Sequence, residues 1–430
     1  MTRTGFVLAL LLASVATAQP ATYFVPIVGR TPDPVPGAAG LQISFVLPDL
    51  GIPASASILF GTGTQQPMPY QLTNLSSGGV SNLPATADAI VAAPGVVIDG
   101  GTHTLLAVSS GGVVSFGTIE TGVFVGRGPG VTIAGTRQLA LAAVPDGGAA
   151  LLVSDGFQIT RWDLDVSTGT VQATKGFSGS AAPAPGGDDS LSLALDGLHD
   201  VGFVGGHTLG DIYVFDARLD AGPPRAFDIA LFSAGRLAPP VSGLAIYGVN
   251  VPLYLLAANG QGLTIYPLPG TVPVNLTSVS RANPDAGFRV IGTDTIRSIT
   301  SPQGVAFTNL GAGPNYLNGV VVIGDPASRQ LATLSWDELA DGGLIIDPAD
   351  PRSRGGGGPD AGCPDGGTSC PPPVDGGHPG NGPGGPGAPP GPGVPVDHGS
   401  SCVCASGSDT PALGAIVAVL ALLARRRQRR

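Results

Sequence analysis

Between about residues 23 and 351 the chain alternates short apolar runs with small polar turns. The segment LLVSDGFQITRWDL, Leu151–Leu164, is typical: two apolar runs flank Asp155-Gly156, a dipeptide that favours the tight turn of a β-hairpin. Five other segments repeat the same order of apolar run, small-residue turn and second run. The six copies start at Ile58, Leu105, Leu151, Val201, Tyr254 and Val320.

The spacing of these copies predicts the fold. Successive starts lie between 46 residues (from 105 to 151) and 66 residues (from 254 to 320) apart, and no long helical pattern separates them. Repeats of about 50 residues built from short strands and Gly-rich turns are typical of β-propeller blades. We therefore predict an all-β, six-bladed β-propeller over residues 19–351, with a seven-bladed ring containing one degenerate copy as the alternative.

The beginning of the chain differs from the repeating region. Residues 1–18 combine an early positive charge, the apolar run Phe6–Ala13 and a small-residue triplet ending at Ala18. This order is typical of a secretory signal peptide, here cleaved before Gln19. We therefore expect the protein to be exported.

The end of the chain also differs. Residues 352–401 are dominated by Gly and Pro and have few apolar side chains to bury, which predicts a disordered, flexible stalk. The apolar run 411–424 follows and precedes a cluster of arginines. As a helix it would reach about 21 Å, which is less than the roughly 30 Å hydrocarbon core of a bilayer. The sequence thus predicts a short C-terminal hydrophobic helix.

Residues 402–430, CVCASGSDTPALGAIVAVLALLARRRQRR, resemble the myxobacterial C-terminal sorting signal, with its cysteine, apolar helix and arginine cluster. This resemblance implies processing near Cys402 or Cys404 and retention at the cell surface, with the C-terminus joined to the cell envelope. A plain tail anchor is the alternative. Both interpretations place the protein outside the cytoplasm.

Composition limits the partners of the propeller. The net charge is −10 and Lys175 is the one lysine among the 430 residues, so the sequence offers no basic surface for a phosphate backbone and nucleic acid is not an expected partner. All four cysteines follow the repeating region, so we expect its stability to come from its core rather than from disulfides. Whether Cys363 and Cys370 pair is left open by their spacing.

Several segments of the repeating region share the wording of one known family. They are TPDPVPGAAGLQISFVLPD (31–49), FQITRWDL (157–164), VSGLAIYG (241–248) followed by YLLAANGQGLTIY (254–266), and VVVIGDPASRQLATLSWDEL (320–339). These segments resemble the β-propeller phytases, secreted calcium-dependent enzymes that remove phosphate from inositol hexakisphosphate. The resemblance implies a six-bladed ring with calcium ions at one mouth of the central channel and basic side chains that hold the substrate.

The positions that this resemblance marks as calcium ligands or basic residues are mostly neutral here. Calcium needs six to eight oxygen ligands, mainly carboxylates. Asp88 and Asp325 are the remaining candidate metal ligands, and turn capping is the other interpretation of both. The replaced positions are Gly40, Leu41, Thr64, Gln65, Gln66, Gly206, His207, Ser242 and Gln303.

These replacements predict a binding or scaffold module with weak or no catalysis and an unidentified ligand at the propeller face. The alternative is an active calcium-dependent 3-phytase, with calcium as cofactor and inositol phosphate as the candidate ligand.

Other candidate catalytic or metal sites have weaker support in the sequence. His199 and His207 lack a third zinc ligand, and no G-x-S-x-G motif marks a serine hydrolase.

Overall fold

In this computed structural model, the described residues are 22–35, 41–49, 57–62, 67–136, 138–155, 158–175, 181–183, 192–206, 212–218, 230–232, 241–249, 253–268, 288–293, 298–341, 344–347 and 349–353. The chain separates into two compact units, Met1–Gly366 and Gly367–Arg430, and every described residue lies in the first. The predicted signal peptide (1–18) and sorting signal (402–430) lie outside the described residues. So does the predicted stalk (352–401) apart from its first two residues.

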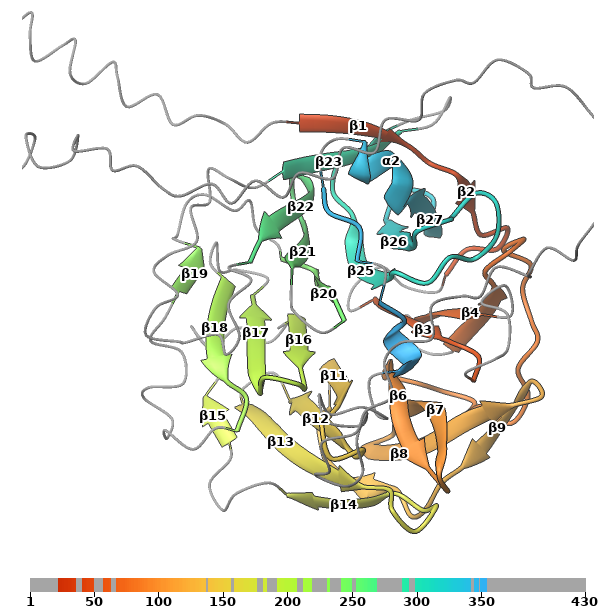
Figure 1. The fold of residues 1–430 in the computed structure, drawn as a ribbon, viewed down its shortest axis with the longest axis vertical. Helices are drawn as coiled ribbons and strands as arrows, with labels where there is room; N and C mark the ends of the chain where they lie inside the picture. The colour runs from red at the N-terminus through yellow and green to blue at the C-terminus, as the bar shows by residue number, and fades with distance from the viewer. Residues whose placement is uncertain are drawn as a thin grey trace, which may run out of the picture. The chain divides into compact units, whose positions relative to one another are not determined.

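The described strands form six sheets, which are the blades of a β-propeller (Figure 1). The predicted fold class and blade number are thereby confirmed. Blade 1 contains β3 (Gln42–Val46), β4 (Ile58–Thr62) and β5 (Pro67–Gln71). Blade 2 contains β6 (Ala89–Ile98), β7 (Gly101–Ser110), β8 (Val113–Glu120), β9 (Val123–Gly126) and β10 (Val131–Thr132).

The next two blades follow in chain order. Blade 3 contains β11 (Gln138–Ala143), β12 (Ala149–Ser154), β13 (Gln158–Asp165), β14 (Gln172–Lys175) and β15 (Ala181–Pro183). Blade 4 contains β16 (Ser192–Asp196), β17 (Val201–Gly205), β18 (Ile212–Asp216) and β19 (Ala230–Phe232).

Blade 5 contains β20 (Gly243–Tyr247), β21 (Tyr254–Asn259), β22 (Gly262–Pro267), β23 (Phe288–Thr293) and β24 (Ser298–Ile299). Blade 6 contains β25 (Gln303–Thr308), β26 (Val320–Asp325) and β27 (Gln330–Ser335). The helix α2 (Trp336–Ala340) follows, and the 3₁₀ helix η4 (Pro351–Ser353) ends the described chain.

The start of the propeller region completes its last two blades. β1 (Thr22–Pro26) pairs in parallel with β23, and β2 (Gly29–Arg30) pairs antiparallel with β27, so both N-terminal strands are outer strands of blades formed about 300 residues later (Figure 1). The first strand of each blade is its inner strand. The inner strands β3, β6, β11, β16, β20 and β25 contact one another in this cyclic order, and β25 also contacts β3.

The six repeated segments are the second and third strands of the blades. Leu151–Leu164, for example, forms β12 and β13. Its Asp155 shapes the turn, because Asp155 Oδ1 accepts a hydrogen bond from the Gln158 amide at 2.7 Å. Another hairpin, between β6 and β7, turns at Asp99-Gly100, where both residues have positive φ, as two-residue hairpin loops require.

The hydrophobic core is divided into six clusters, one at each interface between neighbouring blades. Alternate residues of an inner strand enter different clusters: Leu139 and Leu141 pack toward blade 2, whereas Ala140 and Ala142 pack toward blade 4. Both faces of the sheet are therefore buried. This explains why the strands read as continuous apolar runs rather than as alternating apolar and polar residues.

Candidate functional site

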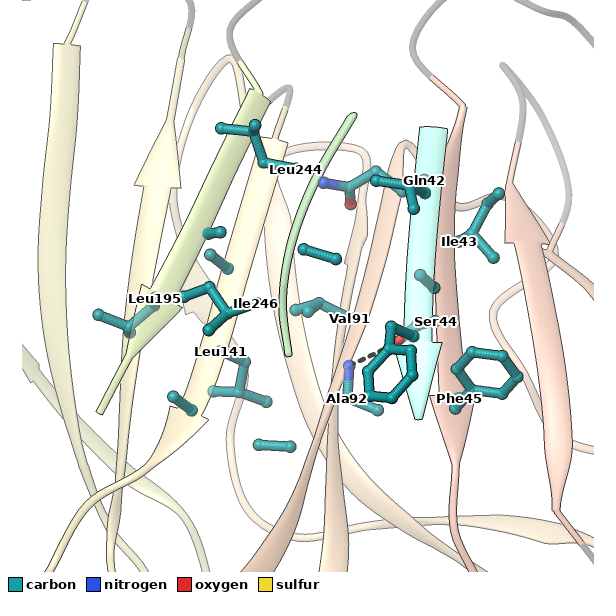
Figure 2. Close-up of a pocket in the computed structure, with 18 of the residues that line it drawn as sticks. Gln42, Ile43, Ser44, Phe45, Val91, Ala92, Leu141, Leu195, Leu244 and Ile246 are labelled. Carbon is teal, nitrogen blue, oxygen red and sulfur yellow. Dashed lines mark hydrogen bonds between the residues drawn. The ribbon is translucent and has the colours of Figure 1, made fainter. Parts of the chain in front are cut away.

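A cavity of about 230 Å³ lies where the six inner strands meet (Figure 2). Each inner strand contributes to its wall, and Val91, Leu141, Leu195 and Ile246 are among the apolar side chains around it. We call this cavity the central channel. It has two ends, because the inner strands all begin at one end and all finish at the other.

At the end where the inner strands begin, two glutamine side chains meet. Gln42 Nε2 donates to Gln138 Oε1 at 2.6 Å and to the Leu139 carbonyl at 3.2 Å. These bonds join blade 1 to blade 3 past the start of β6, so Gln42 reaches across this end of the channel. We call it the amide end.

The orientation of the Gln42 amide follows from these contacts. The carbonyl of Leu139 can only accept a hydrogen bond, so the atom facing it must be the Gln42 nitrogen. Gln42 Oε1 is consequently directed elsewhere. It is buried and accepts no hydrogen bond from the described residues, and the same holds for Gln303 Oε1. A buried carbonyl oxygen without a donor costs roughly 1–3 kcal/mol, so this end has unused capacity to accept hydrogen bonds.

Serine hydroxyls tie neighbouring blades together along the channel. Ser44 Oγ accepts from the Ala92 amide at 2.8 Å, a bond that Figure 2 shows as a dashed line. Ser242 Oγ donates to the Pro302 carbonyl at 2.9 Å. The first contact joins β3 to β6, and the second joins the residue before β20 to the residue before β25. Ser242 therefore holds a hydrogen-bond donor where the resemblance to phytases implies a carboxylate.

The backbone of the inner strands also lines the channel. Each inner strand is the last strand of its sheet, so one of its edges has no strand partner within that sheet. Such an edge presents N–H and C=O groups in alternation. Some are used by side chains of the neighbouring blade, as the Ala92 amide is. The channel wall therefore combines apolar side chains with neutral donors and acceptors.

Among the described lining residues, Asp196 has the one ionisable side chain. It is 1% exposed and lies at the end of β16, where its Oδ2 is 2.6 Å from His199 Nδ1. Its Oδ1 accepts from the Leu198 amide at 3.1 Å. Both carboxylate oxygens are thus held by neighbouring groups. The described wall of the channel offers no arginine or lysine to a bound anion.

At the other end of the channel lies part of the segment after α2, residues 344–347 and 349–353, which we call the strap. Pro351 of η4 lines the channel, and η4 contacts β6 (Figure 1). The Val249 amide donates to Asp347 Oδ2 at 2.7 Å, and Arg352 Nη1 donates to the Asp49 carbonyl at 3.3 Å. The strap therefore bonds to the segment after β20 in blade 5 and to the loop after β3. We call this the strap end.

An aromatic cluster anchors the strap. Trp336, Tyr247, Tyr254 and Phe307 pack together, and the rings of Trp336 and Tyr247 stack at 4.0 Å between centroids. Trp336 Nε1 donates to the Ile345 carbonyl at 3.3 Å, and the Ile345 amide donates to Tyr254 Oη at 2.9 Å. Burial raises the pKa of Tyr247 to about 12. The start of the strap is thus held by buried polar and aromatic contacts.

The candidate metal ligands lie in turns. Asp325 is 3% exposed; its Oδ2 accepts from Arg30 Nη1 at 2.7 Å and from Ser328 Oγ at 2.8 Å, and its Oδ1 accepts from the Ala327 amide at 3.0 Å. It caps the turn between β26 and β27 and pairs with β2. These bonds already occupy both carboxylate oxygens.

Asp88 lies just before β6 in blade 2, and its Oδ2 accepts from the Gly111 amide at 3.2 Å, which caps the turn between β7 and β8. Asp88 and Asp325 thus have the capping contacts of the alternative interpretation. In the described part of the chain, no three His, Cys, Asp or Glu side chains converge as a metal site requires. The described residues therefore do not fit a calcium cluster, and metal binding by Asp88 and Asp325 stays a prediction.

Three of the other replaced positions lie among the described residues. Leu41 is buried and lines the channel, and Gln303 begins β25. Gly206 follows β17, whereas Gly40, Thr64, Gln65, Gln66 and His207 lie outside the described residues. The processing candidates Cys402 and Cys404 lie outside them too.

A second cavity, of about 540 Å³, lies between blade 3 and the turn after β16. Arg161 is central to it: Nε donates to Asp163 Oδ1 and Nη1 donates to Asp200 Oδ1, each at 2.7 Å. Burial alone would lower the pKa of Arg161, but these bonds raise it above its ordinary value. One fixed cation thus bridges two carboxylates, so a net negative charge remains at this cavity.

Sequence reasoning missed the amide end and the strap. A signal for the amide end exists, because a polar residue opens several inner strands in phase with the repeat, just before the apolar run. The strap had no such signal, since its contacts are made with residues far away in the sequence. These opening residues are Gln42, Gln138, Ser192, Ser242 and Gln303.

Solved structures resemble this chain at low sequence identity. No protein-family model and no curated protein matches the chain. Among solved structures, the calcium-binding protein regucalcin from Agrobacterium tumefaciens is 15% identical, covers 72% of this chain and 94% of its own, and has a TM-score of 0.43. The β-propeller domain of Myceliophteria thermophila Cps50 (Swd1) is 9% identical, with coverages of 72% and 99% and a TM-score of 0.38. The Dos1 propeller is 11% identical, with coverages of 68% and 66% and a TM-score of 0.34.

Within the described ranges, no helix is both long enough and apolar enough to cross a membrane.

Proposed function

We propose that this protein is an exported, surface-anchored binding module of phytase-like descent. The observation that supports this best is the neutral lining of the central channel. At one position where the resemblance implies a calcium ligand, Ser242 lines the channel and donates to the Pro302 carbonyl. Gln303, at another such position, is also uncharged and borders a separate small cavity beside Asp325. Neutral groups of this kind bind ligands but do not hold a cluster of divalent cations.

The position of the strap supports display of the amide end. The described chain ends at Ser353, at the strap end of the channel, and the predicted stalk and sorting signal follow it in sequence. A tether attached there leaves the amide end on the opposite side of the propeller. The point where the tether attaches thus lies at the other end of the channel from the amide end.

Phosphate chemistry requires groups that this channel does not provide among its described residues. Hydrolysis of a phosphate monoester in the resembled family implies calcium ions, which polarise the phosphate, and basic side chains, which hold it. Asp325 is already bonded to Arg30, and Asp88 caps a turn. A polyanion such as inositol hexakisphosphate would enter a channel without a compensating charge.

The phosphatase alternative is tested with the purified full-length chain. We expect no calcium-stimulated release of phosphate from inositol hexakisphosphate, and no rise in the melting temperature with millimolar calcium. A ligand that binds only the folded state stabilises it, so a bound calcium cluster would raise the melting temperature. A rise in both measurements would overturn the proposal in favour of an active calcium-dependent phytase.

Surface anchoring is tested by cysteine substitution in a host that processes such sorting signals. We expect the double substitution Cys402→Ala and Cys404→Ala to release the protein into the medium or leave it unprocessed. The matched control is Cys363→Ala with Cys370→Ala, in the predicted stalk, which should leave surface retention unchanged. Retention by both variants would contradict the sorting-signal assignment.

A further inference from the structure

We infer that the central channel binds a small neutral polyol of up to about one six-membered ring. This inference rests on the proposed binding function and names its ligand class. The channel wall contains both hydrogen-bond donors and acceptors, supplied by the free edges of six inner strands and by the side chains at the amide end. A hydroxyl group both donates and accepts, so a molecule with several hydroxyls matches such a wall.

The amide end supplies a specific acceptor. Gln42 Nε2 is held by Gln138 and by the Leu139 carbonyl, which leaves the buried Gln42 Oε1 to accept from a group outside the described protein. Because this oxygen has almost no exposed surface, a ligand hydroxyl that satisfies it displaces the groups packed against it. A site with a buried polar atom of this kind discriminates against an analogue that lacks the donor, because binding that analogue leaves the atom unpaired.

The charge of the channel excludes ionic ligands. Asp196, the one ionisable side chain of the described wall, is bonded to His199 and to the Leu198 amide. A phosphate or carboxylate in the channel would therefore be buried without a cation. Burying an unpaired charge is far more costly than burying a hydrogen-bonded hydroxyl. The channel should thus distinguish a sugar from its phosphate.

The volume sets the size of the ligand. Cavities of about 150 Å³ in other proteins bind benzene, so the channel, at about 230 Å³, has room for a ring with hydroxyl substituents. The strap closes one side of this space, since Pro351 forms part of its wall. A long chain polymer does not fit within it.

The test uses the purified full-length chain and ligand-detected NMR titration. The probes are four neutral polyols of increasing size, namely glycerol, erythritol, xylose and glucose, together with glucose 6-phosphate. We expect at least one neutral polyol to bind about tenfold or more tightly than glucose 6-phosphate. We also expect Gln42→Leu to weaken that binding by about tenfold, the effect of one lost hydrogen bond.

A second variant obstructs the channel. Ala245 lies on β20, is half-buried and lines the cavity, so Ala245→Leu places extra atoms in the space that the ligand needs. We expect it to reduce polyol binding at least tenfold, the loss that follows when about 1.4 kcal/mol of binding free energy disappears. The matched controls are Gln172→Leu and Ala173→Leu on the outer strand β14. Both should bind like the unaltered chain, and melting temperatures verify that each variant is folded.

Three results would overturn the inference: no polyol binds, glucose 6-phosphate binds as well as glucose, or the folded Gln42→Leu and Ala245→Leu variants both bind normally. Each of these leaves the proposed binding function standing if calcium-stimulated phosphate release is also absent. Calcium-stimulated phosphate release would instead remove the proposed function, whatever the polyol result. The two failures are therefore distinguishable.

Discussion

The two ends of the central channel are held by different kinds of contact. At the strap end, Trp336 and Tyr247 are fully buried and stacked, and Asp347 and Arg352 bond the strap to loops of other blades. At the amide end, the crossing contact is a pair of neutral hydrogen bonds from Gln42. Buried aromatic packing contributes several kcal/mol, whereas a neutral hydrogen bond contributes about 1 kcal/mol.

This difference separates a rigid end of the propeller from an end that retains unused hydrogen-bonding capacity. The strap end combines packing with satisfied hydrogen bonds and leads to the predicted tether. The amide end contains a buried acceptor, Gln42 Oε1, without a donor among the described residues. Substitutions at the strap end should therefore affect stability, and substitutions at the amide end should affect binding.

The largest expected effect is that of Trp336→Ala. The side chain is fully buried, so its removal leaves a cavity and should lower the free energy of unfolding by about 3–5 kcal/mol. Denaturant unfolding measures the change. The control is Phe24→Ala on β1, where the ring is 67% exposed and the expected change is within about 0.5 kcal/mol. Equal losses in the two variants would show that the cluster does not anchor the strap.

A smaller effect concerns alkaline pH. The folded-state pKa of Tyr247 is raised to about 12 by burial, above the value of about 10 expected in the unfolded chain. The unfolded chain therefore loses this proton first. The stabilisation from neutral Tyr247 is complete below pH 10 and is lost as the pH rises from 10 to 12.

Tyr247→Phe tests this pH dependence. The variant should lose less stability than the unaltered chain between pH 10 and 12, as measured by denaturant midpoints at each pH. At neutral pH it should be about 1 kcal/mol less stable, because the Asp347 amide loses Tyr247 Oη as its acceptor. An alkaline decline as steep as in the unaltered chain would contradict the assignment.

The smallest expected effect on stability is at the amide end. Gln42→Leu removes two neutral hydrogen bonds but also removes a buried unsatisfied oxygen, so the two changes partly offset each other. The free energy of unfolding should change by no more than about 1 kcal/mol. A loss as large as that of Trp336→Ala would show that the Gln42 bridge is a structural support of the ring rather than part of a binding site.

The sequence predicted the blades better than the site. Leu151–Leu164 was predicted as a hairpin because its turn chemistry and apolar runs are local features, and it forms β12 and β13. Inner strands such as Gln138–Ala143 were harder to identify, since a short apolar run buried on both faces lacks an alternating pattern. Asp88 and Asp325 were predicted as metal ligands from a family resemblance. In the structure, Asp325 forms an ion pair with Arg30, 295 residues away in the chain.

The sequence by itself determined the architecture, because the repeat length, the apolar runs and the Gly-containing turns all act within one blade. Only the tertiary structure decided what lies at the centre. Closing the ring brings Gln42 to Gln138 and pairs the first two strands with outer strands of the last two blades. It also places Pro351 of the strap at one end of the channel. These contacts join residues from different blades, and their geometry depends on how six cores pack together.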